Sequence, residues 1–583
     1  MIKKLLSSVR DYKKDTILTP VYVTFESLLE IVIPTLMAYL IDYGIDKKNM
    51  SYVMMMGLAL FLSAMFSLIV GALAGRSAAV ASSGFAKNLR HDMFYSVQKF
   101  SFSNIDKFST GSIITRLTTD ITNVQMAFQM IIRLGIRAPL MIIFSLIFSF
   151  RISARMSLIF LAVIPVLFTG LIMIAWHVHP IFVRVFNTYD RLNNVVQENL
   201  LGIRVVKSYN RESHEEEKFA GISQSIYNDF TKAEKRLAFN MPLMQFCLYT
   251  CMILLSWFGA KEIVASGNNP ALGLSTGDLM GLITYAMQIL MSLMMLSMVF
   301  VMIIISRASA ERIVEVLDEE SDLKNGENPI RTVKDGSVAF ENVTFTYARK
   351  ADKPVLDNVS LSIASGETVG ILGGTGSSKS SLVQLIPRLY DTVKGRVTVG
   401  GVDVRDYDIE SLRNQVSMVL QKNILFSGTI KENLRWGNAD ATDEEMVHAC
   451  RLAQADDFIR EFPDGYDTYI DEGGTNVSGG QKQRLCIARA LLKKPKILIL
   501  DDSTSAVDTK TDELIRRAFK QDIPDTTKII IAQRVASVQS ADKIVVLDDG
   551  KINAVGTHDE LLKTCGIYRE VYESQNKGGC LHE

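Results

Sequence analysis

Six apolar stretches in the first half of the sequence are each long enough to cross a lipid bilayer as a helix. They comprise residues 17–41, 52–75, 131–150, 156–178, 239–263 and 278–305. A helix needs about 20 residues to span the hydrocarbon core, where every backbone N–H and C=O group must find its partner inside the protein. The pattern therefore predicts an all-α six-helix transmembrane domain over residues 1–320, embedded in the lipid bilayer.

Basic residues predict how these helices are oriented. The connections after the second and fourth stretches are long and rich in Lys and Arg, and Lys3, Lys4, Arg10, Lys13 and Lys14 precede the first stretch. Basic residues accumulate on the cytoplasmic side of a membrane, so we expect the termini and both long connections there. Arg151 and Arg155, in a short outer loop, point the other way. No small-residue cleavage site follows the first stretch, so we expect it to be retained.

Two carboxylates lie within the first apolar stretch. Glu26 and Glu30 are one helical turn apart and hence on one face. Exposure of charge to lipid is costly, so both are expected to turn inward, with Arg133 or Arg137 as partner. A structural ion pair and the attraction of a cationic substrate both remain open.

The sixth stretch is rich in methionine: Met280, Met287, Met291, Met294, Met295, Met298 and Met302. Flexible thioethers repack around partners of different shape, as at promiscuous binding surfaces, although filling a core is their more common use. His177 and His179 are interpreted as satisfied polar groups.

Each long connection contains a segment suited to contact another domain, Phe102–Asp120 in the first and Leu201–Phe219 in the second. Both are expected to form short helices at the tips of helical hairpins. Because a soluble region follows in the same chain, docking is favoured over a merely solvated charged face.

The second half of the chain has the composition of a soluble domain. Asn, Gly, Pro and Asp between Lys324 and Gly336 are typical of a linker, so we expect a linker over residues 321–336 and a domain over residues 337–583. A formal net charge of +0 argues against nucleic-acid binding. The six cysteines show no C-x-x-C spacing, which argues against a metal cluster and for reduced thiols.

A glycine-rich loop follows an apolar run in this domain and precedes a helical pattern: Gly373, Gly374, Thr375, Gly376, Ser377, Ser378, Lys379, Ser380 and Ser381. The spacing matches G-x-x-x-x-G-K-[ST], whose backbone cradles phosphates while the lysine reaches the β- and γ-phosphates and the hydroxyl binds Mg²⁺. We therefore predict a site for ATP and Mg²⁺. Ser378 replaces the expected glycine, and its side chain is expected to crowd the backbone nearest the phosphates.

Other residues suited to the same nucleotide lie on both sides of this loop. Tyr347 is placed to stack on the base, and Gln421 follows a strand and suits the metal or its water. A further phosphate-facing design, glycine backbone ahead of a helix, occurs at Ser478, Gly479, Gly480 and Gln481. A buried strand ends in Asp501 and Asp502, where a metal-bound triphosphate needs acids. The predicted metal ligands are Ser380, Gln421 and Asp501.

These motifs resemble those of the ATP-binding cassette (ABC) transporters, specifically exporter half-transporters that fuse a six-helix domain to an α/β P-loop ATPase domain. The resemblance covers nearly the whole chain. It implies that Tyr347 is the A-loop aromatic, residues 373–380 the Walker A loop, Gln421 the Q-loop, residues 478–481 the signature, Asp501 the Walker B aspartate and residues 505–508 the D-loop.

The same resemblance implies two coupling helices in the long connections and a second half-transporter subunit as partner. Each ATP would then lie between the Walker motifs of one chain and the signature of the other, so that one chain alone cannot complete a site.

Two residues depart from the family pattern at hydrolytic positions. Asp502 replaces the catalytic glutamate and Gln533 replaces the switch histidine. The shorter carboxylate is withdrawn by roughly 1.5 Å, beyond the hydrogen-bond reach of about 2.6–3.2 Å that proton transfer needs. Glutamine can hold a γ-phosphate but cannot share a proton as imidazole does. With Lys379, these are the candidate catalytic residues of a slow ATPase site. The chain thus resembles the degenerate-site subunit of heterodimeric bacterial multidrug exporters.

The function expected from this resemblance is ATP hydrolysis coupled to export of amphipathic small molecules across the plasma (inner) membrane, with the ATPase domain in the cytoplasm. A homodimeric slow ATPase, an exporter of lipids or peptides, and a nucleotide-gated channel or sensor remain alternatives. Movement of substrate against its gradient separates a pump from a channel.

Overall fold

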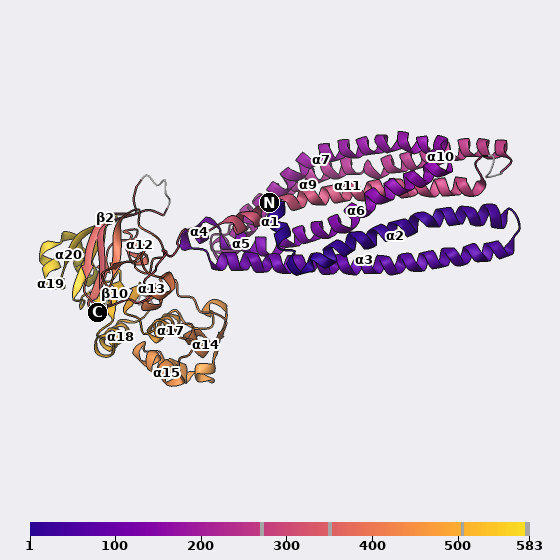
Figure 1. Cartoon of the computed structure of the whole chain (residues 1–583). Coiled ribbons are helices and arrows are strands. Elements are labelled where there is room, and N and C mark those ends of the chain that lie inside the picture. The colour runs from indigo at the N-terminus through magenta and orange to yellow at the C-terminus, as the bar shows by residue number, and fades with distance from the viewer. Residues whose placement is uncertain (269–272, 348–352, 503–506, 578–583) are drawn as a thin grey trace. The chain divides into compact units, whose positions relative to one another are not determined.

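The computed structural model describes residues 1–268, 273–347, 353–502 and 507–577 (Figure 1). The chain forms two compact units. We call residues 1–98 and 110–319 the helical unit, and residues 99–109 and 320–583 the sheet unit.

The helical unit has six helical spans long and apolar enough to cross a membrane among the described residues. They are Arg10–Ile45, Met50–Gln98, Thr110–Ile152, Ala154–Val185, Glu212–Ser266 and Thr276–Asp318. Each contains one of the six apolar stretches, so the predicted number of spans is confirmed. The helices are α1 (Ile2–Ser7), α2 (Lys13–Tyr39), α3 (Met50–Gln98), α5 (Thr110–Thr115), α6 (Ile121–Ile152), α7 (Ala154–Leu201), α8 (Ile203–Ser208), α9 (Glu212–Leu237), α10 (Asn240–Ser266) and α11 (Thr276–Asp318).

Contacts between helices distant in the sequence hold this unit together. In Figure 1, α2 and α3 run side by side, and α6 packs against α2 and α11. The fully buried Asp120 carboxylate accepts hydrogen bonds from Ser309 and Arg312 of α11, which ties the start of α6 to the end of α11. Apolar side chains on α3 such as Phe61 and Leu68 are exposed in the chain, as expected for a face toward lipid.

The first predicted docking segment begins with a short helix. Helix α4 (Phe102–Lys107) begins with a capping box between Ser101 and Asn104. It belongs to the sheet unit, where Tyr390 donates a hydrogen bond of 2.8 Å to Asp106 of α4. Docking of this segment onto the soluble domain is therefore observed, whereas residues 110–120 continue into the helical unit.

The second predicted docking segment contains α8, and the residues from Glu212 onward belong to the long helix α9. Large side chains around α8 are exposed: Leu201 by 82%, Val205 by 60% and Tyr209 by 74%. Docking of this segment stays a prediction.

The sheet unit combines two larger sheets. One is four-stranded in the order β2-β1-β4-β5, and the other six-stranded in the order β12-β11-β3-β10-β9-β6. Its strands are β1 (Val338–Phe345), β2 (Leu356–Ile363), β3 (Thr368–Leu372), β4 (Lys394–Val399), β5 (Val402–Asp403), β6 (Val416–Val419), β7 (Gly428–Thr429), β8 (Tyr469–Ile470), β9 (Ile497–Asp501), β10 (Thr527–Ile531), β11 (Lys543–Asp548) and β12 (Lys551–Gly556). Its later helices are α12 (Lys379–Gln384), α13 (Ile409–Gln415), α14 (Ile430–Arg435), α15 (Asp443–Leu452), α16 (Asp456–Glu461), α17 (Gly479–Leu492), α18 (Thr509–Asp522), α19 (His558–Thr564) and α20 (Gly566–Lys577).

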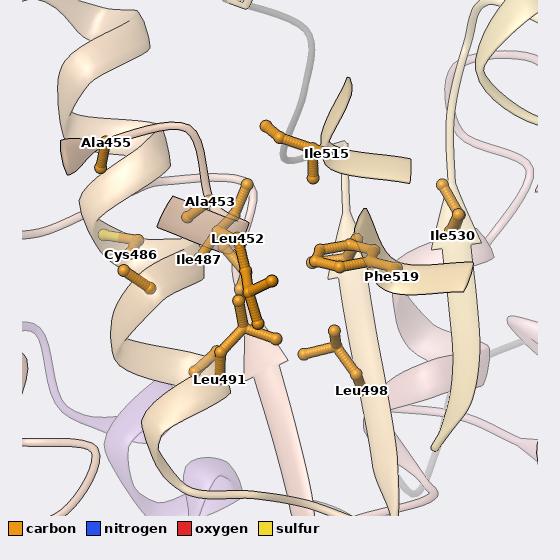
Figure 2. Packing of buried hydrophobic residues seen from close by; sticks show 14 of the residues in the cluster. Leu452, Ala453, Ala455, Cys486, Ile487, Leu491, Leu498, Ile515, Phe519 and Ile530 are labelled. Atoms are coloured by element: carbon orange, nitrogen blue, oxygen red, sulfur yellow. The ribbon is translucent and has the colours of Figure 1, made fainter. Parts of the chain in front are cut away.

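The six-stranded sheet is buried on both faces. In β9, Leu498 and Leu500 pack into one hydrophobic cluster, while Ile497 and Ile499 pack into the other. This alternation is the two-residue period of a strand, and a continuous apolar run is typical of a strand covered on both sides. Figure 2 shows the first cluster, in which side chains of α15, α17 and α18 gather over β9 and β10.

Candidate active site

The carboxyl ends of four neighbouring parallel strands bring most predicted nucleotide-site residues together. In the sheet order β3-β10-β9-β6, the glycine-rich loop follows β3 and Gln533 follows β10. Asp501 and Asp502 lie at the end of β9, and Gln421 follows β6. Ligands of open α/β sheets bind outside this edge, which makes it the candidate active site.

The glycine-rich loop turns tightly between β3 and α12. A Cβ atom on Gly373 would lie 2.4 Å from the Leu547 carbonyl oxygen, so only glycine fits there. Gly376 has a φ of +85°, which glycine adopts without steric cost. The Ser377 hydroxyl closes the turn by donating to the Gly374 carbonyl at 2.8 Å. Backbone groups are thus arranged as a concave loop, the form that anion-binding nests take.

Ser378 adopts the left-handed conformation that the glycine of this motif would take, with φ +71° and ψ +22°. A side chain in that conformation costs roughly 1–2 kcal/mol. The serine therefore does not displace the loop. Its backbone keeps the conformation of the expected glycine, at the cost of local strain.

Lys379 folds over the loop that precedes it. Its ammonium donates to the carbonyl oxygens of Gly373 at 2.8 Å and of Gly374 at 2.7 Å. Burial lowers the pKa of Lys379, and the negative charges of Asp502 and Asp501 oppose that shift. The Lys379 ammonium is therefore held where phosphate oxygens would enter the loop.

Of the two acids at the end of β9, Asp501 has the surroundings that better suit a metal ligand. It is buried, with 4% of its surface exposed, and the Ser380 hydroxyl hydrogen-bonds its carboxylate. Burial raises the pKa of Asp501, the neighbouring charge of Asp502 raises it further, and Ser380 and Lys379 lower it. A buried carboxylate beside a hydroxyl offers the oxygen donors that Mg²⁺ prefers, so these residues fit the predicted cation.

Asp502 has a different environment from its neighbour. Its φ is +49°, and its N–H donates to the Ile531 carbonyl at 3.0 Å. Its carboxylate accepts from the Gln533 amide at 3.2 Å and hydrogen-bonds Gln421. Burial raises the pKa of Asp502, while Lys379, Gln421 and Arg534 lower it. The two acids thus have separate partners: Ser380 for Asp501, and two glutamines for Asp502.

Tyr347 lies beside the helix that follows the loop. Its hydroxyl is 2.8 Å from the Ser381 hydroxyl, and its ring meets Tyr390 edge-on with centroids 5.1 Å apart. The residue is 47% exposed, and burial of the other half raises the pKa of its hydroxyl. The ring is thereby held next to α12 with part of its surface open to a base.

The signature residues form the start of α17. Ser478 is the N-cap, accepting from the Gln481 N–H at 3.2 Å, while the Gln481 side chain accepts from the Ser478 N–H at 2.9 Å. Gly479 is exposed and Gly480 partly so. These hydrogen bonds lie within the cap itself, which leaves the glycine backbone presented outward.

Within the apolar spans, Arg137 of α6 pairs with both carboxylates of α2. Its guanidinium lies 2.8 Å from Glu26 and 2.7 Å from Glu30. Space for Glu26 comes from Gly71 of α3, where a Cβ atom would lie 2.9 Å from a Glu26 oxygen. Arg133 lies near Gly75 instead, so of the two predicted partners Arg137 makes the ion pair.

Other predicted residues have less definite surroundings. The seven methionines of α11 are exposed or partly exposed in this chain. The ring of His177 lies 2.8 Å from the Met173 carbonyl oxygen. The side chain of His179, and Ser505 and Ala506 of the D-loop, lie outside the described part of the chain.

Two glutamines at this site were not anticipated from the sequence. Gln483 of α17 is buried and donates to the Asp502 carbonyl at 3.3 Å. Gln575 of α20 hydrogen-bonds the backbone on both sides of Arg534. In the sequence, both could have been noticed as glutamines at positions that belong, by helical spacing, to the apolar face of their helix.

Comparisons with known proteins agree with this architecture. The family model "ABC transporter transmembrane region" matches residues 16–294, and the model "ABC transporter" matches residues 356–505. The chain is 36% identical to the uncharacterized ABC transporter ATP-binding protein YfiB of Bacillus subtilis (strain 168), over 98% of each protein. It is 33% identical to the corresponding protein Mb1304c of Mycobacterium bovis, over 99% of this chain and 98% of that protein.

A solved structure of a bacterial Atm1-family ABC exporter with ATP bound superposes with a TM-score of 0.80 at 25% identity. The match covers 97% of this chain and 98% of that one. The predicted fold, an all-α six-helix transmembrane domain fused to an α/β P-loop ATPase domain, is confirmed.

Proposed function

The chain belongs to the ABC transporters, and we propose that within this family it is the degenerate-site subunit of a heterodimeric exporter of amphipathic compounds. Membership makes it a multi-pass membrane protein of an ATP-driven transport family, with a domain that binds ATP with Mg²⁺. The observation that carries the finer proposal is the pairing of Asp502 with Gln533 beside an otherwise well-formed phosphate loop.

This chain contains the groups needed to bind the base, the phosphates and the metal of ATP. Tyr347 holds the base, the loop backbone and Lys379 hold the phosphates, and Ser380 and Asp501, with Gln421, hold Mg²⁺. When bound, the cation neutralises charge on the β- and γ-phosphates. The Ser380 hydrogen bond to Asp501 and the Lys379 contacts to the loop carbonyls support this assignment, because both groups already lie around the loop.

Hydrolysis at this site is slow because the groups that position and deprotonate water are altered. Asp502 is one methylene shorter than glutamate, and its oxygens already accept hydrogen bonds from Gln533 and Gln421. These donors occupy the carboxylate oxygens, so Asp502 is poorly placed to accept a proton from a water that lies beyond them. Gln533 has no titratable proton with which to assist.

The partner is a second half-transporter with an intact glutamate and histidine. The outward-facing backbone of Gly479 and Gly480 supports completion of the partner's ATP site by this chain. Exposed Leu201, Val205 and Tyr209 around α8 support a second protein contact at that hairpin tip, since apolar patches of this kind on soluble surfaces mark interaction sites.

Amphipathic substrates suit the membrane-spanning surface. Methionines such as Met287, Met291 and Met298 of α11 are 40–58% exposed in the single chain, which supports an adaptable apolar lining. Because Arg137 pairs with both Glu26 and Glu30, those carboxylates are better assigned to holding α2 against α6 than to attracting cations.

In the proposed cycle the ATPase domains lie in the cytoplasm and the spans cross the plasma (inner) membrane. ATP draws the two domains together, coupling helices such as α4 move with them, and the substrate cavity turns outward. Hydrolysis at the partner's site resets the transporter.

The proposal is tested by comparing ATP turnover of the purified chain with that of its complex with a half-transporter bearing the catalytic glutamate. We expect the lone chain to be slower by at least about a hundredfold, the usual contribution of general-base catalysis. Brisk turnover by the lone chain would favour a homodimer instead. Uptake of a dye into inverted vesicles against its gradient distinguishes a pump from a gated channel.

The role of the carboxylate pair is tested with a second dye experiment. Replacing Glu26 and Glu30 together by Gln is expected to weaken transport of cationic and neutral dyes alike, because an ion pair between helices is lost. Selective loss of cationic dyes would instead assign the pair to substrate binding.

A further inference from the structure

One face of helix α20 is a stripe of apolar and aromatic residues that packs against the rest of the sheet unit. Tyr568 is fully buried, and Val571 and Tyr572 pack against the same hydrophobic cluster. The Tyr568 hydroxyl also lies 2.7 Å from the His558 ring nitrogen of α19. Positions 568, 571, 572 and 575 share one helix face by their spacing. The fourth of them is Gln575, a polar residue where the stripe would otherwise continue as apolar.

The Gln575 side chain binds two backbone groups of the segment that follows β10. Its amide nitrogen donates to the Gln533 carbonyl at 2.9 Å, and its amide oxygen accepts from the Val535 N–H at 2.9 Å. One side chain thus holds the peptide groups on both sides of Arg534. The carboxamide of Gln carries a donor and an acceptor on one planar group, which matches this pair of backbone partners.

The segment held in this way carries the side chain that meets Asp502. Gln533 donates through its own amide to the Asp502 carboxylate at 3.2 Å. A continuous set of hydrogen bonds therefore runs from α20 through the backbone of Gln533 to Asp502. Gln575 is exposed, so removing it leaves no buried cavity, and its contribution lies in these two hydrogen bonds.

We propose that Gln575 is a positioning residue for the nucleotide site, which orients Gln533 toward Asp502 and toward the γ-phosphate of bound ATP. This inference rests on the proposed role of Gln533 at the γ-phosphate. It places the end of α20 in control of how strongly this site prefers ATP over ADP, because ADP lacks the phosphate that Gln533 would contact.

The test uses the full chain purified in detergent and measures equilibrium binding of ATP and of ADP with Mg²⁺. Gln575→Glu keeps an acceptor for the Val535 N–H but loses the donor to the Gln533 carbonyl, and Gln575→Ala loses both. Ser574→Ala, an exposed neighbour on the same helix, is the matched control. For both Gln575 variants we expect ATP binding to weaken by about threefold to tenfold, the range of one net hydrogen bond, with ADP binding unchanged.

Equal weakening of ATP and ADP would assign Gln575 to packing alone and overturn the proposal, as would unchanged binding of both. Gln533→Ala, measured in parallel, should show the same selective loss, and combining it with Gln575→Glu should add nothing, because both changes act through one contact. A selective loss in Gln533→Ala without one in Gln575→Glu would overturn the positioning role only. No loss in Gln533→Ala would overturn the proposed role of Gln533, and the positioning role with it.

Discussion

The phosphate-binding side and the water-activating side of the nucleotide site lie on the same sheet edge but are built differently. On the first, Lys379 donates to the loop carbonyls and Ser380 hydrogen-bonds Asp501. On the second, Asp502 and Gln533 are paired with each other. Binding and hydrolysis depend on separate groups, so one side can be retained while the other is lost.

In the function proposed above, this difference lets one chain be slow at its own site and still be necessary to the complex. The exposed cap of α17 belongs to neither side, since Ser478 and Gln481 hydrogen-bond each other. Its glycine backbone is available to a nucleotide held by another chain. Changes in the two sides and in this cap should therefore have separable effects.

The largest effect is expected from Gly479→Asp in the complex. A carboxylate there would face the partner's phosphates and displace a backbone donor, and loss of one such donor costs about a hundredfold or more in turnover. Asp502→Asn should change turnover of the complex by less than about twofold, since this site contributes little to the total. Steady-state ATPase assays compare the two, with Gly326→Asp in the linker as control. Equal losses would show that both sites hydrolyse equivalently.

A smaller effect is expected from Lys379→Ala on nucleotide binding. Hydrogen bonds to a charged group contribute about 1.5–3 kcal/mol, so ATP affinity should fall by about tenfold to a hundredfold. Lys394→Ala, an exposed lysine of β4, controls for loss of charge alone. Equilibrium binding of labelled ATP measures both. Unchanged affinity in Lys379→Ala would contradict the assignment of the phosphate-binding side.

Tyr347→Ala should weaken binding by about fivefold to tenfold, near the lower end of an aromatic stack on a base. Because the base is common to both nucleotides, ATP and ADP should lose equally, unlike the selective loss expected for Gln533→Ala. Tyr347→Phe keeps the ring and loses the hydroxyl contacts to Ser381 and Gln384, so it should restore most of the affinity. If Tyr347→Phe is as weak as Tyr347→Ala, the hydroxyl rather than the ring is the important group.

The smallest effect is expected from Ser378→Gly. Relief of the positive φ should stabilise the ATPase domain by about 1 kcal/mol, which raises its unfolding midpoint by about 2–4 °C for a domain of this size. Ser377→Gly is the control, and it should lower the midpoint, because this variant loses the hydrogen bond from the Ser377 hydroxyl to the Gly374 carbonyl. Differential scanning calorimetry separates them. A lower midpoint for Ser378→Gly would mean that its side chain makes a stabilising contact.

Local patterns in the sequence predicted the six spans, the glycine-rich loop and the acidic pair, because each depends on spacing within about 25 residues of chain. Features that depend on residues far apart were less accessible. The choice of Arg137 over Arg133 depends on how α6 packs against α2. Gln575 meets Gln533 only once the chain between them has folded, because the two residues are 42 positions apart. The strained φ of Ser378 follows from the whole loop, not from serine itself.

The central claim, that this site binds ATP well but lacks an effective base, is tested most directly by single-turnover hydrolysis in the complex with the partner's catalytic glutamate disabled. The measurement compares the natural chain with the double variant Asp502→Glu and Gln533→His. A base within reach is commonly worth 10²- to 10⁴-fold, so we predict at least about a hundredfold faster hydrolysis in the double variant, with little change in ATP affinity. No gain in the double variant would contradict the claim and place the defect in the loop at Ser378 or across the subunit interface.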